Sequence, residues 1–198
     1  MQQDSARRTN RERTEATTAH LVESARKLFV EKGYAETATP DIVAAAGVTR
    51  GALYHHFADK QDLFRAVVER EAAAVAAAIE GATPGDLPAR EALLAGGDAF
   101  LSAMSDPARV RLLLVDGPAI LGRDGIDAID ARHATRSLKD GLAAAMEAGA
   151  MRRVPHDALA ALLSSAWDRA ALDIAQGADA SDYREAIAEL LDGLMRTS

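Results

Sequence analysis

The sequence predicts an all-α protein, and two observations support that prediction. Apolar residues recur at steps of three and four along most of the chain, which is the spacing of one buried helix face. No stretch alternates apolar and polar residues long enough to make a convincing strand, and β-branched runs are scarce. Glycine, proline and capping residues separate about nine helical segments, so we expect helices joined by short loops.

The bulk composition is that of a folded intracellular protein. The 198 residues are 48% apolar and 27% charged, and no apolar run reaches the roughly 20 residues that span a membrane. The N-terminus has no apolar signal core. There is no cysteine, which excludes disulfides, zinc–thiolate sites and thiol catalysis. We therefore expect a cytoplasmic protein without a membrane partner.

Charge is distributed unevenly along the chain. The net charge is −7, yet residues 1–70 hold 11 Lys and Arg against 10 Asp and Glu, so the acidity lies in residues 71–198. Four arginines stand near the start of the chain: Arg7, Arg8, Arg11 and Arg13. Because salt screens charges beyond about 10 Å, an acidic chain can still bind DNA through such an end. A solvated tail explains the arginines equally well, and we expect residues 1–14 to form a flexible basic arm.

Four helices are expected before residue 82. Gly33 stops the first, while Thr39 and Asp59 are placed to cap the second and the fourth. The expected ranges are about Glu15 to Lys32, Pro40 to Ala46, Arg50 to Phe57 and Lys60 to Glu80. Residues 81–88 contain Gly and Pro and are expected to form a loop between two bodies. Five further helical segments follow, at about 89–104, 107–115, 123–148, 155–176 and 181–196.

The stretch from Thr39 to Lys60 combines two short helices with a tight turn. Gly47 between the helices suits a left-handed backbone. Leu53 and Phe57 lie four residues apart and share the buried face of the second helix. The residues left on its outer face are Arg50, Gly51, Tyr54 and His55. Arg can read guanine in the major groove and Tyr and His can donate to phosphates, whereas the alternative is an ordinary helical hairpin.

Residues 15–64 resemble the N-terminal domain of TetR-family (tetracycline-repressor-like) regulators. The matching features are Phe29 with Gly33-Tyr34, Ile42 with Ala46-Gly47-Val48, the run from Gly51 to Phe57, and Lys60 with Leu63-Phe64. The resemblance implies a helix-turn-helix DNA-binding domain at residues 15–62, with the third helix in the major groove. It also implies a bacterial, ligand-responsive regulator, expected to be a homodimeric repressor that a small molecule releases from an inverted-repeat operator.

The resemblance also places the DNA contacts on nine residues. They are Thr39, Thr49, Arg50, Gly51, Ala52, Tyr54, His55, His56 and Lys60. Arg50 and His55 are expected near base edges, and the other polar side chains on phosphates. The chain departs from the family where Ala38 replaces the usual Thr or Ser that caps the second helix, so Thr37 or Thr39 must take that role. Val43 stands where the family often has Ala.

Residues 63–198 resemble the family's ligand-binding and dimerisation domain only in their helical layout. That layout implies a pocket lined by the fourth helix and its successors, for a hydrophobic or amphipathic effector. The candidate lining residues are Phe100, Met104, Leu113, Ile120, His133, Arg136, Met146 and Trp167. Each of them is also explained as part of a helix core or of a solvated helix face.

The last two expected helices have apolar stripes that the same layout assigns to a dimer interface of four helices. The stripe residues are Leu159, Leu162, Leu163, Ala166, Ala170, Ile174, Ile187, Leu190, Leu191 and Leu194. A two-fold dimer would read a palindromic operator in double-stranded DNA. The alternative is that the stripes fill the core of a single chain.

Nothing in the sequence favours a metal site, a cofactor or an enzyme. Asp127, Asp130 and His133 follow at steps of three, but Asp127 and His133 would lie about 9 Å apart along a helix. We find no Gly-rich phosphate loop, nucleophile elbow or metalloprotease His-Glu pair. Acid–base chemistry with His133 and Asp168 is the enzymatic alternative. A helix-turn-helix that no longer reads DNA is the other.

Overall fold

The computed structural model describes the backbone of residues 2–195 and the side chains of residues 12–195, and it confirms the predicted all-α fold. The chain divides into two compact units, Met1–Glu69 and Arg70–Ser198. Helices α1 to α3 belong to the first unit, and α4 runs from the first into the second. Their bounds are α1 Gln2–Lys32, α2 Thr39–Ala46, α3 Arg50–His56 and α4 Lys60–Ala82.

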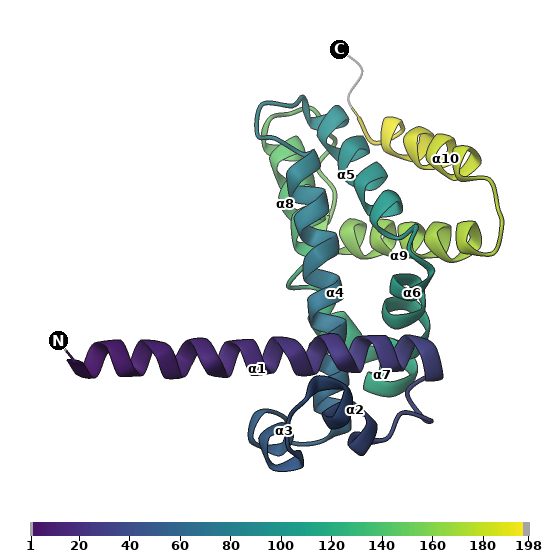
Figure 1. The fold of residues 1–198 in the computed structure, drawn as a ribbon. Helices are drawn as coiled ribbons and strands as arrows, with labels where there is room; N and C mark the ends of the chain where they lie inside the picture. Colours follow the sequence, from purple (N-terminus) through teal and green to yellow (C-terminus); the bar gives the residue numbers. More distant parts are fainter. Residues whose placement is uncertain (1, 196–198) are drawn as a thin grey trace. The chain divides into compact units, whose positions relative to one another are not determined.

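The first unit is built around α1. The helix α2 packs on α1, and α3 follows it on the same side (Figure 1). Leu21 and Phe29 of α1 are fully buried, because they lie on the face that the sequence marks as apolar. The ring of Phe29 lies 5.3 Å from that of Phe64 in α4, edge to face, and Tyr34 lies 5.2 Å from Phe64. This aromatic cluster fixes the start of α4 beside the end of α1.

The first helix begins earlier than expected. Its backbone is helical from Gln2, whereas the apolar spacing predicts a helix only from about Glu15. The side chains of residues 1–11, including three of the four arginines of the predicted basic arm, lie outside the described residues. The DNA-binding role of that arm therefore stays a prediction.

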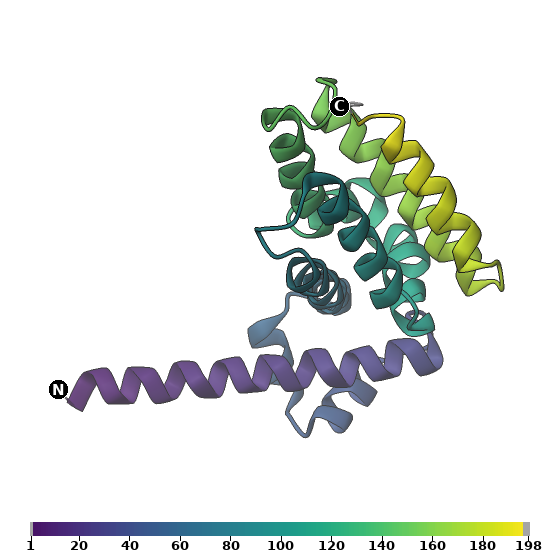
Figure 2. The same ribbon diagram turned by 90° about the horizontal axis from the view of Figure 1, so that it is seen from above.

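The second unit is a set of packed helices. The helix α8 packs against both α5 and α9, and α10 lies beside α9 (Figures 1 and 2). Leu142 of α8 and Leu191 of α10 are completely buried between these layers. The bounds are α5 Ala89–Ala103, α8 Ala134–Glu147, α9 His156–Ala175 and α10 Ala180–Asp192.

Between the expected helical segments 107–115 and 123–148, the residue pattern suggests a break at Gly117-Pro118, and this expectation is wrong because the chain stays helical there. Helix α6 (Pro107–Val110) continues through a π-helical turn, η1 (Arg111–Asp116), into α7 (Gly117–Asp130). Pro118 follows directly on this π-helical turn and lies in the first turn of α7. The break comes instead at Gly122, whose φ of 75° is left-handed.

The segment 123–148, expected as one helix, is two. Helix α7 ends at Asp130 and α8 begins at Ala134, with a non-helical backbone at His133. The carboxylate of Asp130 accepts hydrogen bonds from the hydroxyls of Thr135 and Ser164, so the turn is tied to α9. No Gly or Pro marks this turn, which explains why the residue pattern missed it.

Candidate DNA-binding surface and effector cavity

The turn between α2 and α3 is closed by backbone hydrogen bonds. Gly47 has a φ of 64°, a left-handed conformation that glycine adopts without steric strain. The amides of Gly47 and Val48 donate to the carbonyls of Ala44 and Val43, at 3.2 and 3.0 Å. The residues buried beneath the two helices are Ile42, Leu53 and Phe57. This small apolar core holds α3 at a fixed angle to α2.

The outer face of α3 is exposed. Arg50, Gly51 and His55 are exposed, Tyr54 keeps 44% of its surface accessible, and Ala52 is half-buried behind them. The guanidinium carbon of Arg50 lies 5.5 Å from the centre of the Tyr54 ring, close enough for a cation–π interaction. Arg50 forms no ion pair with any described residue, so its five N–H donors remain available to a ligand.

The two helices begin differently. The hydroxyl of Thr49 caps α3 by accepting a hydrogen bond from the amide of Ala52 at 3.1 Å. The cap position of α2 is Ala38, which forms no side-chain cap. The expectation that Thr39 caps α2 is therefore wrong, because Thr39 is the first helical residue. Its hydroxyl has no described partner, and Thr37 is turned into the interior.

His56 turns away from the outer face of α3 toward α1. Its Nδ1 lies 3.3 Å from the hydroxyl of Thr18, and that hydroxyl donates to the carbonyl of Thr14 at 2.9 Å. Because a hydroxyl has one hydrogen to give, Nδ1 of His56 must be the donor in the first contact. The side chain of His56 thus helps to attach α3 to α1.

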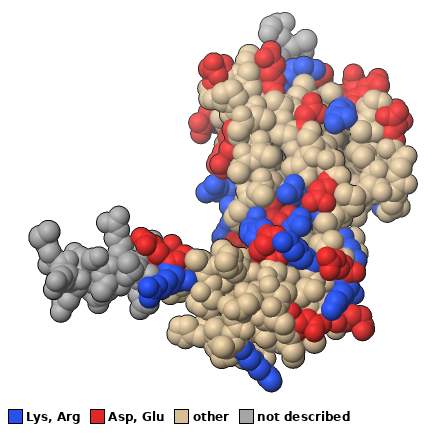
Figure 3. Space-filling view, in the orientation of Figure 1, with Lys and Arg blue, Asp and Glu red and all other residues tan. Residues whose placement is uncertain are grey.

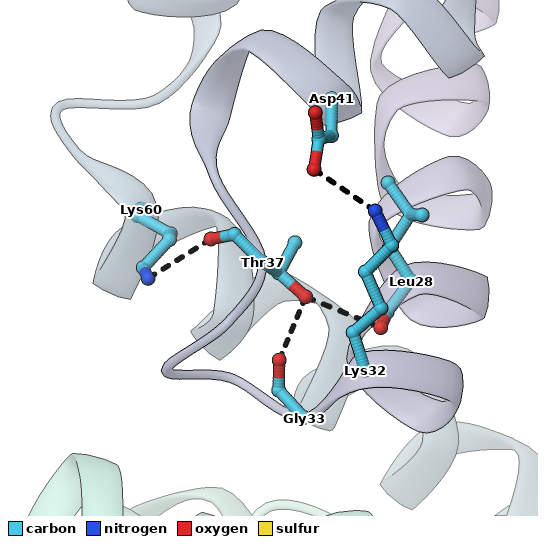
Figure 4. A network of polar contacts seen from close by, with 6 residues as sticks. All are labelled: Leu28, Lys32, Gly33, Thr37, Asp41 and Lys60. Atoms are coloured by element: carbon cyan, nitrogen blue, oxygen red, sulfur yellow. Dashed lines mark hydrogen bonds and ion pairs between the residues drawn. The ribbon is translucent and has the colours of Figure 1, made fainter.

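Lys60 binds the loop between α1 and α2. Its Nζ donates to the carbonyls of Tyr34 and Thr37, at 2.9 and 3.0 Å, and lies 4.2 Å from the centre of the Tyr34 ring. The buried hydroxyl of Thr37 is shared between the carbonyls of Gly33 and Leu28, at 2.7 and 3.2 Å (Figure 4). Two of the three N–H donors of Lys60 are therefore bonded within its own unit, and its predicted phosphate contact stays a prediction.

Three aspartates near α2 and α3 are engaged in local bonds. Asp41 pairs with Lys32 at 3.0 Å (Figure 4). Asp59 caps α4 as predicted, by accepting from the amide of Asp62 at 2.7 Å, and Asp62 accepts from the amide of Ala58. On the face seen in Figure 3, the surface around α2 and α3 is mostly uncharged, with a basic side chain projecting at its lower tip and acidic side chains at its right edge. A polyanion can therefore approach the lower tip more readily than the acidic edge.

The second unit contains an apolar cavity of about 110 Å³. Its wall is formed by α4, α5, α8 and α9, and its polar side chains are hydroxyls and one indole. The lining residues are Ile79, Thr83, Ala92, Leu93, Gly96, Gly97, Phe100, Ala134, Ser137, Leu138, Gly141, Ser164 and Trp167. No described residue in this wall carries a formal charge, so the cavity suits an uncharged ligand.

Two of the eight sequence-predicted pocket residues, Phe100 and Trp167, line this cavity. Six others lie elsewhere: Met104, Leu113, Ile120, His133, Arg136 and Met146. The two methionines are buried in the helix core, and Arg136 extends to Glu80 at 3.4 Å on the surface. The sequence could not separate these environments, because methionine at helical spacing fits a core and a pocket equally well.

The predicted dimer stripes divide into two faces. Four of the ten residues are buried in their own unit: Leu163, Ala170, Ile187 and Leu191. Leu162 and Leu190 are instead 70% and 59% exposed. The other four are half-buried: Leu159, Ala166, Ile174 and Leu194. The stripes thus have a buried side and an exposed side, and the role of the exposed side in a dimer stays a prediction.

Two polar arrangements in the second unit were not foreseen. Glu71 in α4 is buried and pairs with Arg109 of α6 at 3.0 Å, and Arg109 also donates to the carbonyl of Ala103. Asp168 in α9 is largely buried beside Asp130. Burial and this second carboxylate raise the pKa of Asp168 to about 7.

Among the described residues, no cluster of His, Asp and Glu is arranged to hold a metal ion. Nor does any helix in that part of the chain combine the length and the apolar character needed to cross a membrane.

The two short helices, the tight turn between them and the exposed face of the second helix form a helix-turn-helix, the domain that characterises one class of DNA-binding regulators. Residues 21–67 match the bacterial regulatory proteins of the tetR family, and residues 90–197 match the tetracyclin repressor-like C-terminal domain. A TetR-family transcriptional regulator of known structure from Pectobacterium atrosepticum is 32% identical, with a TM-score of 0.73 over 94% of this chain and 98% of that one. The chain belongs to the TetR family of transcriptional regulators.

Other relatives are similar in sequence over shorter stretches of this chain, or share only its fold. The regulator AcrR of Shigella flexneri is 47% identical over 64 residues, or 32% of this chain and 29% of AcrR. The regulator TtgR of Pseudomonas putida is 40% identical over 62 residues, or 31% and 30%. The match thus spans less than a third of these curated relatives. A putative tetR family regulator from Shewanella, 19% identical with a TM-score of 0.70 over 91% and 99% of the two chains, shares the fold.

Proposed function

We propose that this chain is a homodimeric repressor that binds an inverted-repeat operator and is released when a small molecule enters the cavity. The observation that carries the proposal is the exposed face of α3, where Arg50, Tyr54 and His55 stand together without a carboxylate. A helix with small residues such as Gly51 on this face fits a major groove about 12 Å wide. The proposal assigns the chain no catalytic step and places its action on bacterial DNA, in the cytoplasm.

The polar residues of α3 divide into base-reading and backbone-binding groups. Arg50 has unpaired donors that fit the O6 and N7 acceptors of guanine. Tyr54 supports the Arg50 guanidinium and can itself donate to a phosphate. Thr39 adds a hydroxyl at the start of α2. Lys60 and His56 position the reading helix instead, because both are bonded within their own unit.

The dimer would form through the exposed faces of α9 and α10. Leu162 and Leu190 are two of the four large apolar side chains most exposed among the described residues. Ala158, Ala161 and Ser165 accompany Leu162 on the exposed face of α9, so a partner helix could approach closely. A two-fold axis through this face gives two copies of α3, as an inverted-repeat operator requires.

The helix α4 offers a route from the cavity to the DNA-binding unit. Its last turns supply Ile79 to the cavity wall and Thr83 follows directly after them, while its first turns supply Leu63 and Phe64 to the core of the first unit. A ligand that favours one position of α4 would bias the spacing of the two reading helices. A coupling of about 1–3 kcal/mol, typical of allosteric proteins, changes operator affinity 5- to 150-fold.

The first test is fluorescence anisotropy of the protein on the intergenic DNA upstream of its own gene, at two salt concentrations. We expect binding that is tighter than to a scrambled duplex and that weakens steeply with salt. Arg50→Ala should lower the affinity for the upstream DNA by about 1–3 kcal/mol, the usual contribution of one bidentate base contact.

Arg153→Ala is the matched control. Arg153 is exposed, lies outside the DNA-binding unit and forms no contact with a described residue, yet its removal changes the net charge equally. We expect near wild-type binding. Equal losses in both variants, or equal binding to both duplexes, would contradict the assignment of α3 as the reading helix.

A further inference from the structure

The size of the cavity limits its ligand. Its volume of about 110 Å³ is of the same order as that of the roughly 150 Å³ engineered cavity that accommodates benzene, a single ring. Small side chains create the space: Gly96 on α5 and Gly141 on α8 present no side chain to it. A β-carbon on Gly141 would lie 3.4 Å from Cδ2 of Leu93, and one on Gly96 would lie 3.5 Å from Cγ2 of Thr83. The cavity therefore fits a compound of about one ring.

The wall has three hydroxyls, on Thr83, Ser137 and Ser164, and those of Thr83 and Ser164 are bonded within the protein. Thr83 donates to the carbonyl of Ile79 at 2.9 Å. Ser164 donates to the carboxylate of Asp130 at 3.3 Å, and its hydroxyl oxygen lies 3.2 Å from that of Thr135, which donates to the same carboxylate. These two groups are tied to the protein and leave little hydrogen-bonding capacity for a ligand.

Trp167 differs from these hydroxyls. The side chain is only 6% exposed, and its indole N–H donates to no described atom. Every fully enclosed side-chain nitrogen and oxygen of the described residues has a partner, so the indole nitrogen keeps some open surface. Trp167 lies in the cavity wall, which makes a ligand in the cavity the candidate partner of this donor. An indole N–H can only donate, so its complement is a hydrogen-bond acceptor.

The cavity also selects against charge. No lining residue is ionised, and the Asp130 carboxylate next to Ser164 repels an anion. Transfer of an ionised group into such a site without a counter-charge is strongly unfavourable.

We propose that the effector is a neutral compound of about one ring whose carbonyl or ether oxygen accepts a hydrogen bond from Nε1 of Trp167. This inference rests on the proposed function, since it names the class of molecule that regulates DNA binding. It makes Trp167 the residue that selects an oxygen-bearing ligand over a hydrocarbon of the same shape.

Three probes of similar size test the inference: acetophenone, ethylbenzene and benzoate. They differ in having a neutral acceptor, no acceptor and a negative charge. Trp167 is the sole tryptophan, so its fluorescence reports binding in the wild-type protein directly, and calorimetry reports it in variants. We expect acetophenone to bind, and benzoate to bind at least tenfold more weakly.

Trp167→Phe separates the hydrogen bond from the aromatic packing. The variant should lower the affinity for acetophenone, relative to that for ethylbenzene, by about 2- to 12-fold, the range for one neutral hydrogen bond of about 0.5–1.5 kcal/mol. Gly141→Ala, which narrows the cavity beside Leu93 without touching Trp167, should weaken both ligands without changing their ratio. The Gly141→Ala measurement remains a test of the inference even if Trp167→Phe does not fold.

Benzoate binding as tightly as acetophenone, an unchanged ratio in folded Trp167→Phe, or Gly141→Ala without effect on acetophenone would overturn the inference. Absence of acetophenone binding at millimolar concentration would overturn it too, while operator binding by the same protein would leave the DNA-binding proposal standing. Acetophenone that binds by these criteria without changing operator affinity would support the ligand class and contradict the regulatory role of the cavity.

Discussion

The Cζ2 atom of Trp167 lies 2.5 Å from the place where a β-carbon on Gly97 would stand. Two other indole atoms lie at 2.7 Å from that point, so the ring rests directly on the backbone of α5. Gly97→Ala must therefore displace Trp167 or the helix. We expect a loss of about 1–3 kcal/mol in the free energy of unfolding, measured by urea denaturation. The emission of Trp167 should shift as well.

Gly96→Ala is the matched control for that substitution. A β-carbon there meets its nearest neighbours at 3.5 and 3.6 Å, ordinary contact distances. Because alanine is the better helix former, the free energy of unfolding should stay unchanged or rise by up to about 1 kcal/mol. Equal destabilisation by both alanines would show that Trp167 does not rest on Gly97.

Lys60→Met separates a positioning role from phosphate binding. Because Nζ of Lys60 bonds the Tyr34 and Thr37 carbonyls, we expect the free energy of unfolding to fall by about 1–3 kcal/mol. The slope of log affinity for DNA against log salt should stay that of the wild type. A slope smaller by about 0.9, with unchanged stability, would instead identify Lys60 as a phosphate ligand.

Asp168 makes stability depend on pH. Its pKa is raised to about 7 by burial and by Asp130, so the folded protein binds a proton that the unfolded chain has already lost. The stability that this proton provides is present below pH 4 and is lost as the pH rises to about 7. Asp168→Asn should therefore raise the free energy of unfolding at pH 8, by at most about 1.4 kcal/mol per unit of pKa shift, and change it little at pH 4.

The control is Asp173→Asn, for which the expected change in the free energy of unfolding at pH 8 has the opposite sign. Hydrogen bonds from Tyr183 and Arg169 lower the pKa of Asp173, so its ionised form stabilises the fold above its ordinary pKa. The variant should lose stability at pH 8, and the loss should shrink as the pH falls below 4. Urea unfolding across this range checks both, and identical profiles for the two variants would refute the assignments.

The double variant Leu162→Glu, Leu190→Glu tests the proposed dimer face. Both side chains are exposed in the single chain, so the charges should not disturb its fold but should prevent burial against a second copy. Sedimentation should show monomers at concentrations where the wild type is a dimer. Val115→Glu, at a residue 51% exposed outside α9 and α10, should leave the dimer intact. If Val115→Glu dissociated the dimer and the double variant did not, the dimer interface would lie near Val115 and not on α9 and α10.

The helices and the helix-turn-helix could be predicted because their signals are local. Gly47 stands where a left-handed turn is needed, and Leu53 and Phe57 have the spacing of one helix face. The outward direction of Arg50 and Tyr54 follows from the same spacing. Periodicity also identified the apolar stripes of α9 and α10.

Contacts between distant segments could not be predicted in this way. Lys60 is bonded to Tyr34 and Thr37 because the loop between α1 and α2 passes beside it, and no sequence spacing reports that path. The contact of Trp167 with Gly97 joins positions 70 residues apart. Each depends on how the helices pack.

The side of each stripe that meets the core depends on packing as well. Leu162 and Leu163 are adjacent in the sequence, yet the first is 70% exposed and the second 5%. Both are leucines on one predicted apolar stripe, so the packing of the neighbouring helices decides which of the two is buried.

The most direct test of the reading helix is selection from a library of random DNA duplexes by the wild-type protein, followed by binding of the selected sequence to Arg50→Ala. We expect an inverted repeat whose half-sites are centred about one helical turn, or a multiple of it, apart. We also expect a guanine in each half-site whose preference disappears in the variant. Recognition by α3 would be contradicted if the selection enriched no sequence. It would also be contradicted if Arg50→Ala bound the selected sequence with the affinity and base preference of the wild type.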